Sequence, residues 1–310
     1  VLLLKQFLRG IGVYGAEAKV HGFSGYLSEL LVIRYGSFQE VVRSAAGWKP
    51  GVVLDLEQAY PSEAEPRVLF ERQPLVVVDP VDPRRNVAAS VSMRSFATFV
   101  LACRDFLRAP REEFFFPRAP VLLTRTEFSK RLRRRGTTLC CLWLKHDGLP
   151  EDIVYPQLRK TERAVSNELV QAGFEILRSD VWADPQNAAV LVELSLPKLP
   201  PVQIRPGPQI PLDVSNFVKE HTKSERRIAG PYVDEAGRVV FEVRRAETDG
   251  VRCLERVIRE HRGFGKHIAK AIEARRHRLL VNMEIARLMR NKDFREFLSD
   301  YLDKRLPWYR

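Results

Sequence analysis

The chain is a basic polypeptide of 310 residues, with a net charge of +12 at pH 7 and 45% hydrophobic residues. Its length favours two or three domains over one, and no apolar run approaches the ~18 residues that suggest a membrane-spanning helix. A basic excess of this size favours a polyanionic partner, with nucleic acid ahead of an anionic membrane surface. We therefore expect a globular protein that binds nucleic acid and has no membrane partner.

Residues 1–112 are predicted to form a mainly helical domain. Leu3, Phe7 and Ile11 follow the helical period from the start of the chain. Because this apolar pattern begins at Val1 without a cap, we expect that an N-terminal portion is missing. Further along we expect a helical pattern at 26–38, an irregular connection at 47–73, a strand at 75–78 and an amphipathic helix at 90–107.

Residues 118–205 are predicted to form a small domain that alternates helix and strand. We place Pro156 at the first position of its long helix, where proline is favoured. The expected elements are a basic helix at 128–135, a strand at 137–145, a helix from 156 to 173, and strands at 174–183 and 188–196. Strand, helix, strand, strand is half or more of a ferredoxin-like fold.

Residues 206–310 are predicted to mix both element types, so the whole chain is assigned to the α+β class. The expected elements are a short helix at 214–221, a hairpin over 230–245, a helix at 251–261, a second from 266 to about 281, and a helical end.

Cysteine and histidine patterns argue against disulfides and zinc. The four cysteines form no CxxC motif, and Cys140 and Cys141 are adjacent, which is poor geometry for a shared metal or a mutual disulfide. The histidines show no paired zinc spacing. We expect buried free thiols, a cytoplasmic location and no metal site. The oligomeric state stays open, and a homodimer is allowed.

The stretch from Tyr14 to Leu27 is the first candidate for a functional segment. Its glycines, at positions 15, 22 and 25, would be costly inside a helix. They suggest that the backbone comes close to a ligand such as a phosphate. Lys5 and Tyr14 could then direct an ammonium and a phenol at the same anion. The competing interpretation is a solvated lysine and a core tyrosine beside a glycine-rich turn.

The segment from Asp79 to Ala89 is the second candidate. Asp79 and Asp82 could hold a metal, but we favour the interpretation that they shape a turn and cap a helix. Arg85 stands beside Asn86 in this proline-rich turn. A planar donor fork held there suits recognition of a base edge.

Basic residues gather in three further segments. Seven lie between Arg118 and Arg135, three on the helix after Pro156 (Arg159, Lys160 and Arg163), and nine between Val251 and Arg278. Arg252, Arg256 and Arg259 share one helical face. Each group could be a solvated face, but together they favour contact with RNA or DNA phosphates. We also expect the Gly263–His267 break to turn helix N-terminal amides outward to a phosphate, beside Lys266 and His267.

Several of these motifs resemble the archaeal class I CCA-adding enzymes, which are tRNA nucleotidyltransferases. The two long ones are Lys5 followed by Tyr14-Gly-Ala-Glu-x-Lys-Val-x-Gly-Phe-Ser-Gly-Tyr-Leu-x-Glu-Leu30, and Val78-Asp-Pro-Val-Asp-Pro-Arg-Arg-Asn-Val-Ala-Ala89. Shorter matches are Tyr155-Pro-Gln-Leu158, Gly207-Pro-Gln209, Gly265-Lys-His-Ile268 and Leu306-Pro-Trp308. The resemblance follows the chain in order over nearly its whole length.

The resemblance implies that residues 1–112 are the neck, 118–205 the body and 206–310 the tail of such an enzyme. That family adds C, C and A to tRNA 3′ ends from CTP and ATP, with Mg²⁺ held by a preceding head domain. It further implies that this chain by itself is inactive and holds no catalytic residue. By carry-over, Lys5 and Tyr14 contact the triphosphate, Arg85 reads the base, and tRNA is bound by Lys160, Arg163, Lys266 and His267.

Two other functions stay open at this point. The chain could be a non-catalytic tRNA- or RNA-binding protein that kept the scaffold. It could also be another polymerase-β-like nucleotidyltransferase, such as a relative of the poly(A) polymerases.

Overall fold

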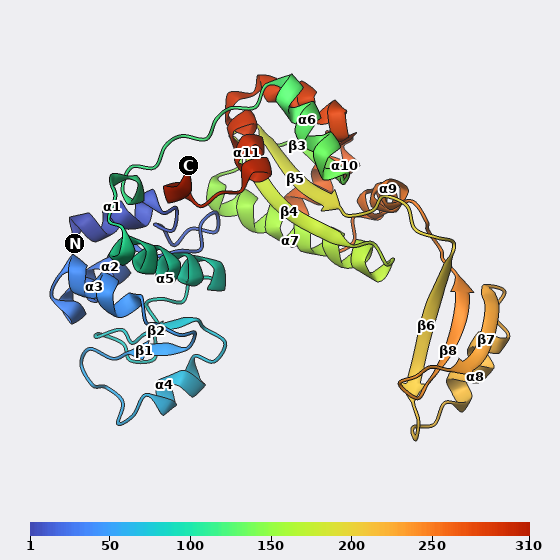
Figure 1. Cartoon of the computed structure of the whole chain (residues 1–310), viewed down its shortest axis with the longest axis horizontal. Coiled ribbons are helices and arrows are strands. Elements are labelled where there is room, and N and C mark those ends of the chain that lie inside the picture. Colours follow the sequence, from blue (N-terminus) through green and yellow to red (C-terminus); the bar gives the residue numbers. More distant parts are fainter. The chain divides into compact units, whose positions relative to one another are not determined.

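The computed structural model describes all 310 residues, which divide into two compact units. Unit 1 comprises Val1–Leu122 together with Glu296–Arg310, and unit 2 comprises Leu123–Arg295 (Figure 1). Both contain helices and strands, which confirms the α+β class. None of the helices combines the length and the apolar character needed to cross a membrane.

Unit 1 is mainly helical, as expected. Its helices are α1 (Leu2–Gly10), α2 (Gly25–Tyr35), α3 (Phe38–Ala45), α4 (Ala64–Leu69), α5 (Met93–Arg108) and the short 3₁₀ segments η1 (Glu112–Phe114) and η3 (Pro307–Tyr309). The expectation that residues 47–73 are irregular is wrong in part. They contain α4 and the strand β1 (Val52–Leu54), which pairs in parallel with β2 (Leu75–Val77).

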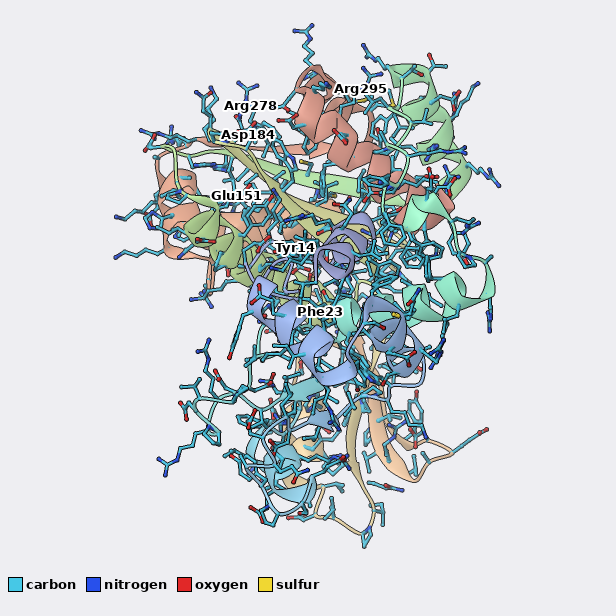
Figure 2. All side chains as sticks on the ribbon, turned by 90° about the vertical axis from the view of Figure 1, so that its left-hand side faces the viewer. Tyr14, Phe23, Glu151, Asp184, Arg278 and Arg295 are labelled. Atoms are coloured by element: carbon cyan, nitrogen blue, oxygen red, sulfur yellow. The ribbon has the colours of Figure 1, made fainter.

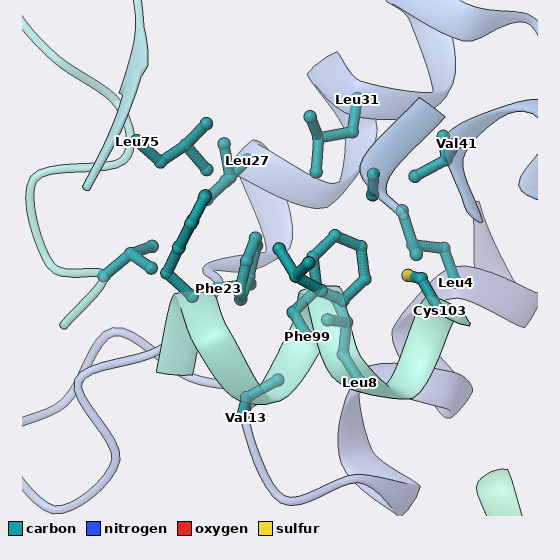
Figure 3. Close-up of a cluster of buried hydrophobic side chains, with 14 of the residues drawn as sticks. Leu4, Leu8, Val13, Phe23, Leu27, Leu31, Val41, Leu75, Phe99 and Cys103 are labelled. Carbon is teal, nitrogen blue, oxygen red and sulfur yellow. The ribbon is translucent and has the colours of Figure 1, made fainter. Parts of the chain in front are cut away.

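The core of unit 1 is rich in aromatic side chains. α1, α2, α3 and α5 each bury one apolar face in a common cluster, part of which is drawn in Figure 3. Phe7, on α1, lies near its centre, with five phenylalanine rings at centroid distances of 5.5–6.4 Å. Aromatic pairs in these geometries add roughly 0.5–1.5 kcal/mol each beyond the area they bury. The core therefore fixes the positions of α1 and α2, and the first candidate segment connects these two helices.

The end of the chain completes this same core. Trp308 is 1% exposed and stacks on Phe114 with ring centroids 5.5 Å apart. Its indole N–H donates to Asp105 Oδ2 (3.1 Å), and the Tyr309 hydroxyl donates to the same oxygen (2.7 Å). Arg111 donates to the Trp308 carbonyl oxygen (3.3 Å). The Leu306-Pro-Trp308 motif thus fixes the C-terminal segment to α5 and η1.

Unit 2 is built on a four-stranded antiparallel sheet with the strand order β4-β5-β3-β9. Its strands are β3 (Thr138–Lys145), β4 (Ile176–Ala183), β5 (Asn187–Leu194) and β9 (His277–Val281), and its helices are α6 (Arg125–Arg135), α7 (Glu151–Gln171), α9 (Gly250–Glu260), α10 (Lys266–Glu273), η2 (Asn282–Arg290) and the start of α11 (Lys292–Asp303). With α9 left out, the order β3-α7-β4-β5-α10-β9 is that of a ferredoxin-like fold. This confirms the strand, helix, strand, strand order expected before residue 205, and α10 and β9 complete the fold from residues that the prediction assigns to the tail.

A second, three-stranded sheet is inserted between β5 and α9. It has the order β6-β8-β7, from β6 (Val202–Gln209), β7 (Arg227–Val233) and β8 (Arg238–Arg244), with α8 (Ser215–Thr222) packed on it. The expected hairpin turn is confirmed, since Asp234 Oδ1 accepts from the backbone N–H groups of Ala236 and Arg238. The division into 1–112, 118–205 and 206–310 stays a prediction.

Two expectations for unit 2 are wrong. The helix expected from Lys266 to about Val281 ends at Glu273, and residues 277–281 form the edge strand β9, which pairs with β3. Pro156 is not at a helix start, because α7 begins five residues earlier at Glu151. Two acidic residues in the first turn stabilise that earlier start. Because Pro156 has no N–H, the helix then lacks one backbone hydrogen bond in its N-terminal part.

The cysteines are buried free thiols, as predicted. Burial raises the pKa of Cys140 to about 12 and that of Cys253 to about 12. These thiols therefore stay protonated and behave as small apolar side chains.

A buried ion pair ties α6 to the sheet of unit 2. Glu193, on β5, has a side chain with no exposed surface, and Arg135 binds it through two nitrogens at 2.6 and 2.9 Å. Arg178 lies 3.5 Å from the same carboxylate, and Thr137 donates to it. Burial pushes the pKa of Glu193 upward, but the hydrogen bonds from Arg135 and Thr137 and the two guanidinium charges outweigh burial and lower it.

We expect Glu193→Gln to lower the free energy of unfolding at pH 7 by roughly 1–3 kcal/mol, because it takes the counter-charge from the half-buried Arg135 and weakens its hydrogen bonds. A lowered folded-state pKa gives stability that is present above the ordinary glutamate pKa and lost as the pH falls through the lowered value. The difference between wild type and variant should therefore shrink on acidification, in urea unfolding followed from pH 7 to pH 3. Exposed Glu235→Gln is the control, and a pH-independent difference would contradict this account.

Candidate functional site

A short backbone ladder organises the glycine-rich segment of unit 1. The N–H of Gly15 donates to the Phe23 carbonyl oxygen, and the N–H of Phe23 donates to that of Val13, both at 2.8 Å. Gly22 closes the ladder through a 2.8 Å bond to Gly15. A Cβ on Gly22 would lie 2.0 Å from the Val13 carbonyl oxygen, so only glycine allows the two strands of the segment to approach this closely.

The ladder places the start of α2 against Lys5 and Tyr14. A Cβ on Gly25 would lie 3.3 Å from the Tyr14 hydroxyl oxygen and 3.6 Å from Lys5 Nζ. The ammonium also bonds Glu29 Oε1 at 2.7 Å, and the guanidinium of Arg9 lies over the Tyr14 ring at 4.5 Å. Tyr14 and Phe23 are labelled in Figure 2. The structure therefore brings both predicted phosphate-contacting side chains to one point.

That point is also a helix N-terminus. Ser24 is the N-cap of α2, and its hydroxyl oxygen accepts from the backbone N–H of Leu27 at 3.0 Å. The first N–H groups of a helix have no intrahelical partner, so those of Gly25 and Tyr26 remain for a ligand. They add the partial positive charge of the helix dipole to the ammonium of Lys5. The combination is suited to binding a phosphate.

The second candidate segment lies across a cleft from the first. Asp79 is 3% exposed, and its carboxylate contacts Arg85 at 3.5 Å and the Tyr26 hydroxyl at 3.4 Å. The Val81 N–H donates to the same carboxylate at 3.0 Å. Burial, followed by the charge of Asp79, raises the pKa of Tyr26, which keeps its hydroxyl a donor. Asp79 thus links Tyr26 of α2 to the guanidinium of Arg85.

The cleft has a volume of about 650 Å³ and is lined from both segments, including Ala16, Ser24, Tyr26 and Arg85. The two segments are bound together behind it. The Ser90 hydroxyl donates to the Gly22 carbonyl oxygen (3.0 Å), and the Ser92 N–H donates to that of His21 (2.8 Å). Two motifs about sixty residues apart in the sequence therefore form the walls of one cleft.

Asn86 has a structural role that the sequence did not show. It is 5% exposed, and its amide oxygen accepts from the N–H groups of Val77 and Ala88 at 2.8 and 2.9 Å. Its amide nitrogen donates to the Leu75 carbonyl oxygen at 3.0 Å. The side chain therefore extends the hydrogen bonding of β2 and holds the turn that carries Arg85.

The acidic residues of this turn do not fit a Mg²⁺ site. Asp79 is occupied by Arg85, Tyr26 and a backbone N–H, and Asp82 Oδ1 accepts from the Arg84 N–H at 3.1 Å. No group of three or more Asp, Glu, His or Cys side chains is placed to hold a metal ion. The turn-shaping interpretation of these two carboxylates agrees with the structure.

The remaining predicted site residues lie in unit 2, where α10 packs on α7. Lys160 and Arg163 are exposed on α7, Lys266 is exposed at the start of α10, and His267 is half-buried. The loop before α10 contacts α7 at Gln157, Thr161 and Ala164. Lys160 falls on this same stripe of the helix, on the side that faces the start of α10, whereas Arg163 lies off this stripe.

The expectation that the amides at this break point outward is wrong. The Gly265 N–H donates to the buried Thr161 hydroxyl at 3.0 Å, and the His267 N–H donates to Gln157 Oε1 at 3.3 Å. A Cβ on Gly265 would lie 2.7 Å from Gln157 Cα. The break therefore allows close packing of α10 on α7, and those amides are used within the protein.

Several arginines of the predicted basic clusters are engaged with carboxylates. Arg135 binds Glu193, and Arg159 lies 3.1 Å from Asp180. Arg256 lies within 4 Å of three glutamates, at 2.6 Å from Glu247 in the closest case. These residues stabilise the fold, because their charge is neutralised within unit 2. No sequence signal distinguishes Arg135 from the unpaired arginines, since its partner is 58 residues away, whereas Arg256 and Glu260 have the i,i+4 spacing of a helical ion pair.

Two protein families match this chain. Residues 1–116 match the model for "tRNA nucleotidyltransferase, second domain", and residues 135–281 match the model for "CCA-adding enzyme, C-terminal domain". Most of unit 1 falls in the first match, and the whole sheet of unit 2 falls in the second.

Individual relatives give the same result. The chain is 38% identical to the CCA-adding enzyme of Methanosarcina mazei and 39% identical to that of Methanopyrus kandleri, covering in each case 97% of this chain and 64% of the relative. It is 40% identical to the enzyme of Halobacterium salinarum over 78% of this chain and 52% of the relative. The chain thus spans less than two thirds of the length of these proteins.

We expect Gly25→Ala to weaken the binding of ATP and inorganic tripolyphosphate about tenfold without lowering stability. The added methyl group would lie 3.3 Å from the Tyr14 hydroxyl oxygen and push this hydroxyl aside, and one charge-assisted hydrogen bond is worth about 1.5–3 kcal/mol. Alanine otherwise favours a helix start over glycine. Isothermal titration calorimetry and urea unfolding measure the two effects. Gly47→Ala, in a turn with ordinary contacts, is the matched control, and unchanged binding in Gly25→Ala would contradict the site.

Proposed function

This chain belongs to the archaeal-type CCA-adding enzymes, whose second and C-terminal domains it matches, and we propose that it supplies their nucleotide-recognition and tRNA-binding portion. The complete reaction adds CTP- and ATP-derived nucleotides to tRNA 3′ ends without a nucleic-acid template. The observation that carries the proposal is that Lys5 and Tyr14 meet at the start of α2, while Ser24 and Tyr26 of the same helix start line a cleft that also holds Arg85.

The triphosphate binds at the start of α2. Lys5 supplies a full positive charge, the Tyr14 hydroxyl a neutral donor, and Gly25 and Tyr26 backbone donors. Since the Lys5 ammonium already bonds Glu29, this carboxylate holds the ammonium in place and reduces the motion it loses on binding.

The base binds on the side of Arg85. Cytosine and adenine both present an acceptor ring nitrogen beside an exocyclic amine, whereas uracil and guanine present an N–H at that place. The Arg85 guanidinium can donate a hydrogen bond to the ring nitrogen of cytosine or adenine. With uracil or guanine, it would face another N–H donor and could form no hydrogen bond there. The contact with buried Asp79 limits the directions in which the Arg85 guanidinium can point.

The metal chemistry belongs elsewhere in such an enzyme. Mg²⁺ would neutralise the charge that develops on the transferred phosphoryl group, and the carboxylates of these 310 residues do not fit it. We assign the metal to the head domain implied by the family. The tRNA partner, bound by Lys160, Arg163, Lys266 and His267, and the cytoplasmic location follow from the same family assignment.

We expect Arg85→Ala, in an enzyme that carries the head domain, to lose most of its preference for CTP and ATP over UTP and GTP. A bidentate base contact is worth about 1–3 kcal/mol of discrimination, or roughly 5- to 150-fold in kcat/KM. Arg84→Ala, which also lies at the cleft but does not contact Asp79, should keep the preference. A variant without Arg85 that still selects C and A would contradict its role in base recognition.

We expect the 310-residue chain to bind tRNA and to incorporate no nucleotide. Binding should weaken steeply with salt, with a slope of about −0.7 to −0.9 in log K against log salt for each phosphate contacted. Fluorescence anisotropy and incorporation of labelled CTP measure the two properties. Incorporation by this chain would show that its residues hold the catalytic metal after all.

The alternatives are tested with tRNA lacking its 3′ end and a protein that carries the head domain. Addition that stops after three nucleotides supports CCA synthesis. A long homopolymer tail would favour a poly(A) polymerase relative, and binding without addition would favour a non-catalytic RNA-binding protein.

A further inference from the structure

A basic cleft of about 470 Å³ lies on the sheet of unit 2, at the edge strand β9. We call it the β9 cleft. Trp143 lies at its base, and the charged residues that line it are Lys145, Arg275, Arg276, Arg278 and Arg287. No Asp or Glu is among the lining residues. It does not include any of the four residues predicted to bind tRNA.

Pairing in the sheet explains why these cations converge. Arg278 is the register partner of Trp143 in the antiparallel pair of β9 with β3, so the two side chains lie on the same face. Lys145 lies two residues after Trp143 on β3 and shares that face. Arg287 comes from η2, and Arg275 from the turn between α10 and β9. Four segments, β3, β9, η2 and the turn before β9, therefore direct positive charge at one hollow.

Four of the five cations that line the β9 cleft are not neutralised within the protein. Arg276 binds both carboxylate oxygens of Asp147, at 2.7 and 2.8 Å. Lys145, Arg275, Arg278 and Arg287 are exposed and form no ion pair, in contrast to Arg135 and Arg256. Figure 2 labels Arg278 at the surface of unit 2. Burial lowers the pKa of His277, so the positive charge is carried by arginine and lysine.

The base of the β9 cleft is rigid. The Trp143 ring stacks on Trp182 with centroids 5.4 Å apart, and Phe294 meets both rings edge-on at 5.2 Å. The cations therefore surround a preformed surface, and a ligand does not have to order it first.

The β9 cleft continues toward the predicted RNA surface. A second hollow of about 310 Å³ shares Lys145 and Arg276 with it and is also lined by His267 and Lys270 of α10. Its one acidic residue, Asp147, pairs with Arg276. His267 is one of the residues already predicted to bind tRNA. A basic path thus passes around the end of β3 from one face of the sheet toward α10.

We propose that the β9 cleft binds the phosphodiester backbone of tRNA and extends the RNA-binding surface of α7 and α10 around the edge of the sheet. Concave, acid-free linings with several guanidinium groups suit phosphates, which arginine binds bidentately. The RNA backbone presents phosphates at regular spacing. Such a row of phosphates fits two adjoining basic hollows better than a single small ligand does. This inference rests on the proposed function, in that the chain must bind tRNA.

The test compares the double variant Arg278→Gln/Arg287→Gln with the control Arg290→Gln. Arg290 is exposed on η2 next to Arg287 but does not line the cleft. Binding of the full 310-residue chain to tRNA lacking its 3′ end is measured by anisotropy over a range of salt. We expect the double variant to bind roughly tenfold more weakly near 0.1 M salt, with its salt slope reduced by about 1.5, since each lost phosphate contact removes about 0.7–0.9.

The outcomes separate this inference from the proposed function. If the unsubstituted chain binds tRNA and the double variant binds it as tightly as the control does, the β9 cleft has no role in tRNA binding. The proposed function is then unaffected. Failure of the unsubstituted chain to bind tRNA overturns both. A double variant that keeps its affinity for tRNA but no longer binds inorganic tripolyphosphate would make the cleft a site for free polyphosphate. This result would also overturn the inference. Lys145→Gln/Arg275→Gln repeats the test should the first pair fold poorly.

Discussion

The hydrogen-bonded ladder between residues 13–15 and 22–23 determines where the candidate nucleotide cleft lies. Because Gly22 allows the two segments to touch, α2 begins directly beside Tyr14, and the same backbone is bound by Ser90 and Ser92 of the second motif. The glycines therefore allow segments of this chain to pack closely on one another, and not only a ligand to approach the backbone. A larger side chain at Gly22 or at Gly25 would move Lys5, Tyr14 and the start of α2 apart, although each of these hydrogen-bond donors would still be present.

The phosphate side of the candidate site was largely predictable from the sequence because its parts are local. Lys5, Tyr14 and Gly25 lie within about two dozen residues, and the residue types already suggest their chemistry. Asp79 was harder to assign, since its role depends on Arg85 and on Tyr26, which is 53 residues away. The basic clusters were less predictable still. Whether an arginine is free for RNA depends on a carboxylate across the fold, such as the one 58 residues from Arg135.

The errors in the fold have the same origin. The sequence at residues 277–281 follows a helix without a strong stop signal, and it becomes a strand only because β3 offers an unpaired edge. The short β1 is a strand only because β2 lies beside it. Elements with their own periodicity, such as α5 and α6, were predicted well, since a single buried face specifies them. Tertiary pairing decides the short strands, and a single sequence carries little information about it.

The return of the chain to unit 1 has a consequence for biosynthesis. Arg111 and its partner Trp308 are 197 residues apart, and the segment that connects them contains all of unit 2. On the ribosome, domains tend to fold in the order in which they are made. Here unit 2 can fold first, because the aromatic core of unit 1 is completed only when Leu306 and Trp308 have been translated. The surface that Trp308 covers on Phe114 stays open until then, and a chaperone has its clearest opportunity to bind there.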